Sequence, residues 1–217
     1  YKTFGIEPAG EEGSFFQEVK LEQPITSSYS FKVYSANGET FDESMHNANE
    51  IGSFINWSKG ELEQNGEIIF GGYGVKNDSV NQYPSEMEGK WLLVFYEQAN
   101  FATLQNEIAA EKASGALLIL NTDDTSYIAR AEGGKEGFGF PGSLSLSYLE
   151  EERSSGGVIN IVKPSFAAEL LGLEGVEGLV ELKNKISSEP EGFQAIETEF
   201  SLDYKQNATP RTVDSKN

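Results

Sequence analysis

The sequence of 217 residues contains no cysteine and a single histidine, His46. Without cysteine the chain has no disulfides, no cysteine-ligated zinc, no iron–sulfur cluster and no cysteine nucleophile. A Ser-His-Asp triad would have to use His46, and neither G-x-S-x-G nor H-E-x-x-H occurs. Catalytic zinc usually takes two or three histidines. Most familiar hydrolase chemistry is therefore missing from this chain.

Basic residues are also scarce. Sixteen Lys and Arg stand against 35 Asp and Glu, which gives a formal net charge of −19. Such a surface repels phosphate groups, and nucleic-acid binding depends mainly on basic groups that meet phosphates. We therefore expect neither nucleic acid nor an anionic membrane surface as a partner, whereas cationic peptides and metal ions remain open.

Long hydrophobic runs are absent as well. No apolar stretch approaches the roughly 18–20 residues that a membrane span needs, and no basic-then-apolar signal segment opens the sequence. We expect a soluble chain without an export signal of its own, although a longer parent protein could supply one. Apolar residues make up 38% and aromatic residues 12% of the chain, which is enough for a real core.

The middle of the chain has the clearest pattern. Residues 91–96 and 116–120 are short, continuous apolar runs, which are typical of strands covered on both faces. Between them, residues 102–114 have helical spacing, and Gly115 is predicted to be the C-cap. Strand, helix and strand with short joints predict a β-α-β unit with parallel strands.

The flanking regions predict further elements. Three strands are expected at 29–33, 67–70 and 158–162, a hairpin turn at Asn37-Gly38, and two helices at 165–171 and 176–187. Residues 196–204 alternate apolar and polar side chains, which predicts a strand with one wet face. We expect a polar, glycine-rich loop at 121–142 and a frayed tail from residue 206, while 41–63 remains unassigned.

The order of these elements resembles that of protease-associated (PA) domains inserted in zinc-dependent aminopeptidases. The carrying segments are GEIIFGGYGV at 66–75, MEGKWLLV at 87–94, the helix and strand at 104–119, and the strand and short helix at 159–171. The resemblance implies an α/β (α+β) fold: a β-rich barrel or sandwich with one β-α-β unit and two or three flanking helices. The match is best over 66–171.

The two ends of the sequence resemble the boundaries of such an insertion. FGIEPAG at 4–10 is similar to the segment that leaves the catalytic domain, and TVDSKN at 212–217 to the segment that returns to it. The resemblance divides the chain into a connector with a first strand (1–21), the PA domain (22–205) and a returning tail (206–217). It implies that zinc and its H-x-D and acidic ligands belong to the parent catalytic domain, because no position here matches them.

Several local motifs admit a functional and a structural interpretation. The glycines at 71, 72 and 74 are interpreted as a strand-end turn, since no helix follows as a phosphate loop requires. His46 lies near Asp42 and Glu43, which could form a weak metal site, but a solvated histidine is favoured. Asp123-Asp124 could bind calcium in a loop or sit in a solvated turn.

One loop is the best candidate for partner or substrate contact. Phe138, Phe140 and Pro141 lie among glycines, so they are either an exposed recognition surface or part of the core. Asp123 and Asp124 are included as candidate contacts.

The sequence leaves three hypotheses for the function of this chain. The first is a non-catalytic accessory domain of a zinc aminopeptidase-like enzyme, with the parent catalytic domain and a peptide or protein substrate as partners. For this function we expect no enzyme activity and no cofactor in this chain, and an exported parent that is periplasmic, cell-surface or secreted. The second is a stand-alone binding or receptor-type PA module. The third is a small carboxylate-only enzyme, for which the sequence offers no candidate acid with a raised pKa.

Overall fold

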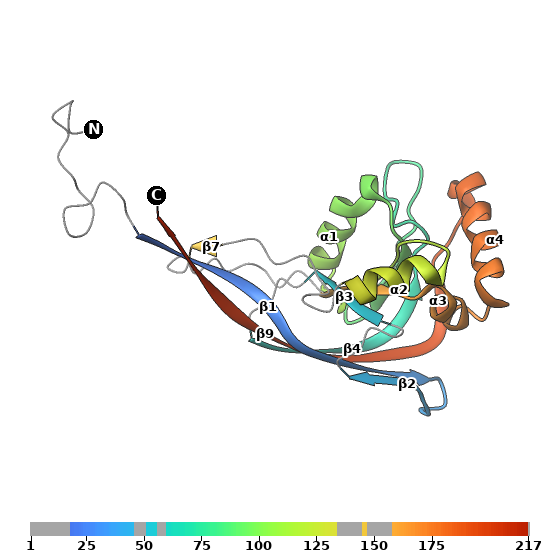
Figure 1. Ribbon diagram of the computed structural model, residues 1–217. Coiled ribbons are helices and arrows are strands. Elements are labelled where there is room, and N and C mark those ends of the chain that lie inside the picture. Colours follow the sequence, from blue (N-terminus) through green and yellow to red (C-terminus); the bar gives the residue numbers. More distant parts are fainter. Residues whose placement is uncertain (1–17, 46–50, 56–59, 134–144, 147–157, 217) are drawn as a thin grey trace.

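The computed structural model of the chain describes residues 18–45, 51–55, 60–133, 145–146 and 158–216. These residues form one mixed sheet and four α-helices, an α/β fold with a β-rich, curled sheet (Figure 1). The sheet order is β2-β1-β9-β4-β5-β6-β8-β3, and β7 pairs with β1. The strands are β1 (Glu18–Ser35), β2 (Thr40–Met45), β3 (Ile51–Ile55), β4 (Gly60–Phe70), β5 (Trp91–Phe95), β6 (Gly115–Ile119), β7 (Ser145–Leu146), β8 (Val158–Val162) and β9 (Ile196–Lys216).

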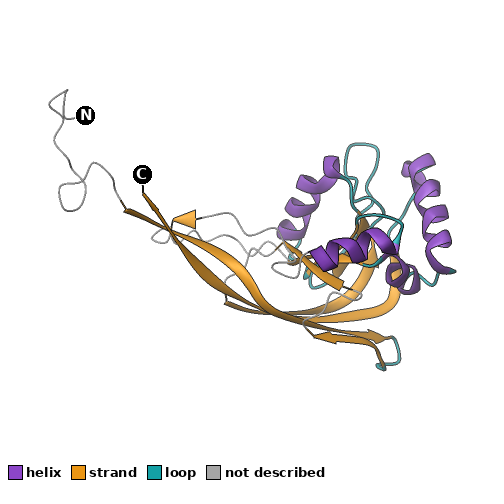
Figure 2. Ribbon diagram, in the orientation of Figure 1, coloured by secondary structure: helices purple, strands orange, loops and turns teal. Residues whose placement is uncertain are grey.

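The helices are α1 (Phe101–Ala110), α2 (Asp124–Gly133), α3 (Pro164–Leu170) and α4 (Gly175–Ser188), with short 3₁₀ turns η3 (Gln98–Asn100) and η4 (Pro190–Gly192). All four helices lie on the same side of the long curved strands in this view (Figure 2). No helix among the described segments is long and apolar enough to cross a membrane.

The predicted β-α-β unit is confirmed. β5 and β6 are parallel neighbours joined through α1, and β4 and β8 extend the parallel part of the sheet on either side. Every residue of β5, β6 and β8 is buried, as expected for strands covered on both faces. This parallel centre is flanked by antiparallel pairs of β9 with β4 and of β3 with β8.

The two faces of the parallel strands belong to two separate hydrophobic cores. Trp91, Leu93 and Phe95 of β5 point into the larger core, which also contains buried residues of β1, β9, α3 and α4. Leu92 and Val94 point into the smaller core, which is shared with α1, α2 and the segment between β4 and β5. The alternation of adjacent side chains in one strand therefore assigns them to opposite layers.

β1 and β9 form a long antiparallel ribbon. The pairing runs from Glu18 opposite Lys216 to Ser35 opposite Phe200. One end of the ribbon is built into the sheet, and the other extends to the side away from the helices (Figure 1). The alternation predicted for the last strand is confirmed from residue 197 onward, because Leu202 and Tyr204 are buried whereas Glu197 and Glu199 are exposed. At the start of the strand the prediction was wrong, since Ile196 is 41% exposed.

Several sequence predictions were wrong in their extent. The tail from residue 206 is ordered strand, since β9 continues to Lys216 by pairing with β1. Residues 121–142 contain helix α2, whose buried Tyr127 anchors it to the smaller core. The unassigned region 41–63 contains β3 and parts of β2 and β4.

Gly115 does not cap α1. The helix already ends at Ala110, the chain reverses at Lys112 with a positive φ of 53°, and Gly115 is the first residue of β6. A Cβ at Gly115 would lie 2.6 Å from a ring carbon of Trp91 and 2.3 Å from the carbonyl oxygen of Val158. Glycine is needed here because the indole and a neighbouring strand occupy the space of a side chain.

Candidate functional site at the carboxyl edge of the parallel strands

The parallel strands β4, β5, β6 and β8 all end at one edge of the sheet, where α/β proteins usually bind their ligands. The segments that leave this edge carry polar and aromatic residues: Tyr73 after β4, Tyr96 and Asn100 after β5, Asp123 and Asp124 after β6, and Lys163 after β8. We take this edge as the candidate site.

The glycine turn after β4 is closed by a protein side chain. Gly72 and Gly74 have positive φ of 57° and 63°, and the N–H groups of the residues that follow them, Tyr73 and Val75, converge on one point. The Gln82 carboxamide oxygen Oε1 accepts the N–H of Tyr73 at 2.9 Å and that of Val75 at 3.3 Å. These donors could otherwise cradle an anion, and they are already used. The interpretation as a strand-end turn is confirmed.

Gln82 is fully buried and packed tightly against this turn. A Cβ at Gly72 would lie 2.9 Å from Gln82 Oε1 and 2.9 Å from a ring carbon of Phe193, so glycine is required by space as well as by φ. The other end of the carboxamide, Nε2, finds no hydrogen-bond partner within the part of the chain that the structure describes. Sequence reasoning did not single out Gln82, because its role depends on a turn ten residues earlier.

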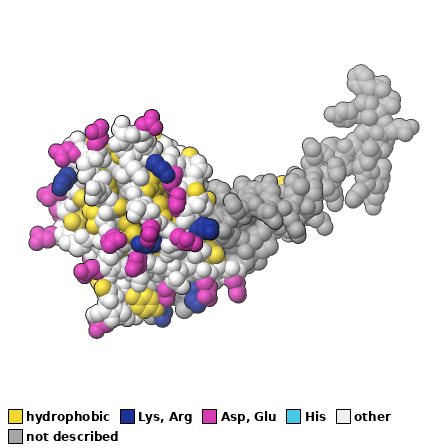
Figure 3. Space-filling view, turned by 180° about the vertical axis from the view of Figure 1, so that it is seen from behind, with side chains coloured by type: hydrophobic (Ala, Val, Ile, Leu, Met, Phe, Trp, Pro, Cys, Tyr) yellow, Lys and Arg dark blue, Asp and Glu magenta, His cyan; other side chains and the backbone are white. Residues whose placement is uncertain are grey.

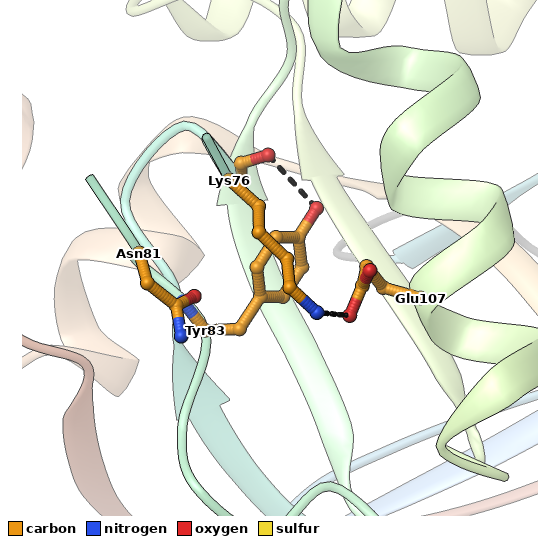
Figure 4. Close-up of polar contacts among 5 residues, drawn as sticks. Lys76, Asn81, Tyr83 and Glu107 are labelled. Atoms are coloured by element: carbon orange, nitrogen blue, oxygen red, sulfur yellow. Dashed lines mark hydrogen bonds and ion pairs between the residues drawn. The ribbon is translucent and has the colours of Figure 1, made fainter. Parts of the chain in front are cut away.

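The loop that follows the turn is fixed to α1 (Figure 4). Lys76 Nζ lies 2.5 Å from Glu107 Oε2, and the Tyr83 hydroxyl donates to the carbonyl oxygen of Gly74 at 2.8 Å. Lys76 and Asn81 form an isolated antiparallel bridge between the two arms of the loop. Burial, and then the nearby Glu107 carboxylate, raise the pKa of Tyr83, so this phenol stays protonated as a donor.

On the other side of the edge, Tyr73 joins the turn to α4. Its hydroxyl lies 2.7 Å from Ser187 Oγ, and its ring packs 5.4 Å from that of Phe95. Lys183 Nζ stands 5.9 Å above the Phe95 ring, within reach of a cation–π interaction. Asn100 Nδ2 donates to the Tyr73 carbonyl oxygen at 3.2 Å. Phe95 is buried, whereas Tyr73 and Lys183 are partly exposed, so the Tyr73 ring and the Lys183 ammonium are the groups that this cluster presents at the surface.

Asp123 and Asp124 are both engaged in holding helices. Asp123 is the N-cap of α2, since its two carboxylate oxygens accept the Ser126 N–H at 2.8 Å and the Ser126 hydroxyl at 2.9 Å. Asp124 Oδ1 accepts the N–H of Ser165 in the first turn of α3 at 2.9 Å, and Oδ2 lies 3.9 Å from Lys163 Nζ. The pair thus joins the beginnings of α2 and α3 at the carboxyl edge.

The other predicted contacts lie outside the described residues. These are Phe138, Phe140 and Pro141; His46, considered above as a weak metal ligand, also lies outside the described residues. Within the described ranges, no three His, Asp or Glu side chains are close enough together to hold a metal ion.

A buried amide in β8 was missed by sequence reasoning. Asn160 is fully buried in the apolar run of β8, and neither its Oδ1 nor its Nδ2 has a hydrogen-bond partner in the described structure. The signal was present as a single asparagine inside Val-Ile-Asn-Ile-Val. An unsatisfied buried amide costs about 1–3 kcal/mol of stability.

The described surface of the body carries a net acidic character. Figure 3 shows more acidic than basic side chains on one face of the body, with hydrophobic surface between them. Exposed carboxylates occur on β4, on β9 and on both ends of α4. This agrees with the net charge of −19 and favours cationic over anionic partners.

The described residues define an α/β domain with a curled, β-rich sheet. No protein-family model matches the chain, and no curated protein matches its sequence. Among solved structures, the chain is similar to an aminopeptidase from Aneurinibacillus sp. strain AM-1, with 17% sequence identity and a TM-score of 0.47. The match covers 93% of this chain and 36% of that chain. The chain thus spans about a third of the length of that enzyme, and a likeness this distant assigns no activity to it.

Proposed function

We propose that this chain is a non-catalytic accessory domain of the protease-associated type that belongs to a zinc metallopeptidase of the aminopeptidase kind. In this proposal, the domain shapes substrate access or mediates protein contacts. Zinc and its ligands belong to the parent catalytic domain, and the parent is exported to the periplasm, the cell surface or the medium. The proposal starts from the PA-domain resemblance of residues 66–171.

The observation that carries the proposal is the β1–β9 ribbon. Glu18 and Lys216 face each other at its far end, so the chain enters and leaves the body side by side. A domain whose ends are adjacent can be inserted into a loop of another domain without disturbing it. A two-stranded ribbon with this geometry suits an accessory domain that is connected twice to its parent.

The chemistry of the carboxyl edge supports binding rather than catalysis. Its donors and acceptors hold one another: Gln82 closes the glycine turn, Asp123 caps α2, and Tyr73 is linked to Ser187. The aromatic and cationic surface around Tyr73 and Lys183 is what remains for a partner. This surface suits a stand-alone binding or receptor-type PA module equally well, which is the second candidate.

An experiment that distinguishes the accessory domain from the stand-alone module is to delete the domain from the gene of its parent protein. Neighbouring strands lie about 4.8 Å apart, so a linker of two or three residues replaces residues 18–216. The accessory function predicts an excised enzyme that retains zinc and cleaves aminoacyl nitroanilides, but has an altered kcat/KM for longer peptides or an altered oligomeric state. A parent without a segment bearing H-x-D and acidic zinc ligands would favour the receptor-type module. Unchanged peptide kinetics and unchanged assembly would contradict the accessory role.

The chain itself is tested with a panel of aminoacyl nitroanilides in the presence of zinc, with bound zinc measured in parallel. We expect no turnover and no stoichiometric metal. Turnover that EDTA abolishes would overturn the proposal, because a metal site would then have to form within this chain.

A further inference from the structure

Large hydrophobic side chains reach the surface on β2 and along the first part of β9. Phe41 of β2 is 42% exposed, and Ile196 of β9 is 41% exposed. Phe200, four residues beyond Ile196 on β9, is half-buried, and its ring lies 4.7 Å from that of Phe41. We call Phe41, Ile196 and Phe200 the hydrophobic strip.

The hydrophobic strip continues the larger core to the surface. Ile196 is the register partner of Phe70, which is fully buried in that core, and directly opposite residues of an antiparallel pair point to the same face of the sheet. Phe200 packs against the same core, and Phe41 stacks on Phe166 of α3 with ring centroids 5.9 Å apart. These are therefore not scattered surface residues, and a connected hydrophobic surface rimmed by polar groups is typical of a contact site.

The segments that carry the strip have charges of mainly one sign. The stretches 164–182 and 186–204 contain no Lys or Arg, and the lysines between them, Lys183 and Lys185, belong to α4. The acidic residues of the two stretches are Glu169, Glu174, Glu177, Glu181, Glu189, Glu191, Glu197, Glu199 and Asp203.

Two exposed acids are tied to the aromatic end of the strip. Glu169 follows Phe166 by three residues on α3, so the two are neighbours on the helix surface. Glu39 precedes Phe41 by two residues, which places both on the same side of an extended chain. A partner that covers the strip therefore has to bring apolar groups together with positive charge.

From these observations we propose that the hydrophobic strip binds an extended, basic peptide segment of a partner protein. One apolar side chain of the segment lies on Ile196 and a second lies on Phe41 and Phe200, while its lysines or arginines meet the surrounding acids. Four residues of extended chain span about 13 Å, so apolar residues four positions apart in the peptide match the separation of Ile196 and Phe200 along β9.

A second copy of this chain is a poor occupant of the strip. Its own strip carries the same acids, and each copy has a net charge of −19, so the two surfaces repel each other. The proposal goes beyond the proposed function, which names neither this surface nor the chemistry of a partner, and each can hold without the other.

The test measures the binding of fluorescein-labelled peptides by fluorescence anisotropy at about 0.15 M NaCl. The probe KLKKKFK carries its leucine and phenylalanine four positions apart. KSKKKSK keeps the lysines without the apolar side chains, and ELEEEFE keeps the apolar side chains with the opposite charge. We expect the probe to bind with a dissociation constant at least about tenfold lower than that of either control peptide.

Substitutions of exposed hydrophobic residues locate the binding site. Ile196→Thr keeps a β-branched residue in β9 and should weaken binding of the probe at least about threefold. The matched control is Ile128→Thr on α2, where the isoleucine is 45% exposed, and it should leave the affinity unchanged. Phe41→Ser is a second strip variant, and circular dichroism checks its folding because Phe41 also stacks on Phe166. Ile196→Thr alone decides the test if that variant does not fold.

Substitutions of acids separate local charge from overall charge. The double variant Glu39→Gln and Glu169→Gln removes the two acids beside the aromatic end of the strip and should weaken binding. The control is Glu86→Gln with Glu88→Gln, which removes the same number of charges from exposed positions in the segment between β4 and β5 and should weaken it less.

Three results would overturn the proposal. The first is that KLKKKFK binds no better than the control peptides. The second is equal weakening by Ile196→Thr and Ile128→Thr, or by the two charge variants, which would mean that the probe is attracted to the net charge and not to the strip. The third is a dimer of the wild-type chain in sedimentation experiments that Ile196→Thr dissociates, which would make a second copy the occupant.

Discussion

At the scale of single residues, Gly115 illustrates how close packing decides residue identity. The Trp91 indole covers it, and the carbonyl oxygen of Val158 lies against it on the next strand. A substitution to alanine forces a methyl group into contact with atoms that the sheet holds in place. We expect Gly115→Ala to lower the free energy of unfolding by about 1–3 kcal/mol, because overpacked cores must shift or strain. Urea denaturation measures this change.

The matched control is Gly192→Ala in η4, where a Cβ would meet no atom within 4 Å. This variant should unfold within about 0.5 kcal/mol of the wild type. Equal stabilities of the two variants would show that β6 moves away from Trp91 without cost.

A second residue-scale prediction concerns alkaline stability. Burial raises the pKa of Tyr29 from 10.0 to about 12, and its ring stacks on that of Tyr204 with centroids 6.4 Å apart. Between about pH 10 and pH 12 the unfolded chain loses this proton while the native chain keeps it, so stability falls as the pH rises. Below this window the contribution is fully present.

Urea denaturation from about pH 9 to about pH 12 should therefore show a smaller alkaline loss for Tyr29→Phe than for the wild type. Parallel pH curves for the two proteins would mean that Tyr29 titrates in the native state as it does in the unfolded chain.

At the scale of elements, α2 depends on its N-cap. Asp123→Ala removes the acceptors of the Ser126 N–H and hydroxyl, and should lower the free energy of unfolding by about 0.5–2 kcal/mol. The control is Thr125→Ala, an exposed position in the same turn, which should change it by less than about 0.5 kcal/mol.

Calcium distinguishes the cap from a metal site at Asp123 and Asp124. Because both carboxylates already accept backbone N–H groups, we expect millimolar calcium to leave the Tm of the wild type unchanged. A rise in Tm that Asp123→Ala abolishes would identify a calcium site instead.

The sequence predicted the elements whose pattern is local, and it missed those that long-range pairing creates. Strands β5, β6 and β8 can be recognised from their continuous apolar runs, because both of their faces are buried. Helices α1 and α4 can be recognised from the helical spacing of their apolar residues, because one side of each helix is buried. The far half of β9 is polar, and it forms a strand because it pairs with β1. In the last pairs of this ladder, the residue of β1 lies 180 or more positions before its partner in the sequence. Helix α2 was not predicted because it has little apolar periodicity: among its described side chains, only Tyr127 belongs to a hydrophobic core.

Less of the candidate site than of the secondary structure could be predicted from the sequence. The glycine turn could be recognised from its sequence, but its closure by Gln82 could not, since an interior carboxamide looks like any polar loop residue. The roles of Asp123 and Asp124 as helix caps required knowing that a helix begins there. The predicted aromatic loop at Phe138 and Phe140 stays a prediction.

At the scale of the whole molecule, net charge dominates the electrostatics. The 217 residues carry a net charge of −19, so the carboxylates repel one another, and this repulsion destabilises the compact native state. Raising NaCl from about 0.05 M to about 0.5 M shortens the Debye length to roughly 4 Å and should raise the Tm by a few degrees. Differential scanning calorimetry measures this shift.

Neutralising exposed acids should reduce the gain from salt. The double variant Glu197→Gln and Glu199→Gln removes two charges from the wet face of β9. A Tm that falls with added salt would instead show that ion pairs such as Lys76–Glu107 outweigh the repulsion.

The division of the interior into two cores has a consequence for how substitutions combine. Leu92 and Leu93 are neighbours in the chain but belong to different layers, whereas Leu93 and Leu117 are on different strands and share one layer. Losses of free energy at Leu92 and Leu93 should therefore approach simple addition, while those at Leu93 and Leu117 should couple through the cavity that they share. In this protein, the separation of two residues along the sequence therefore says little about whether the effects of their substitutions are independent. Whether the two side chains point to the same face of the sheet says more.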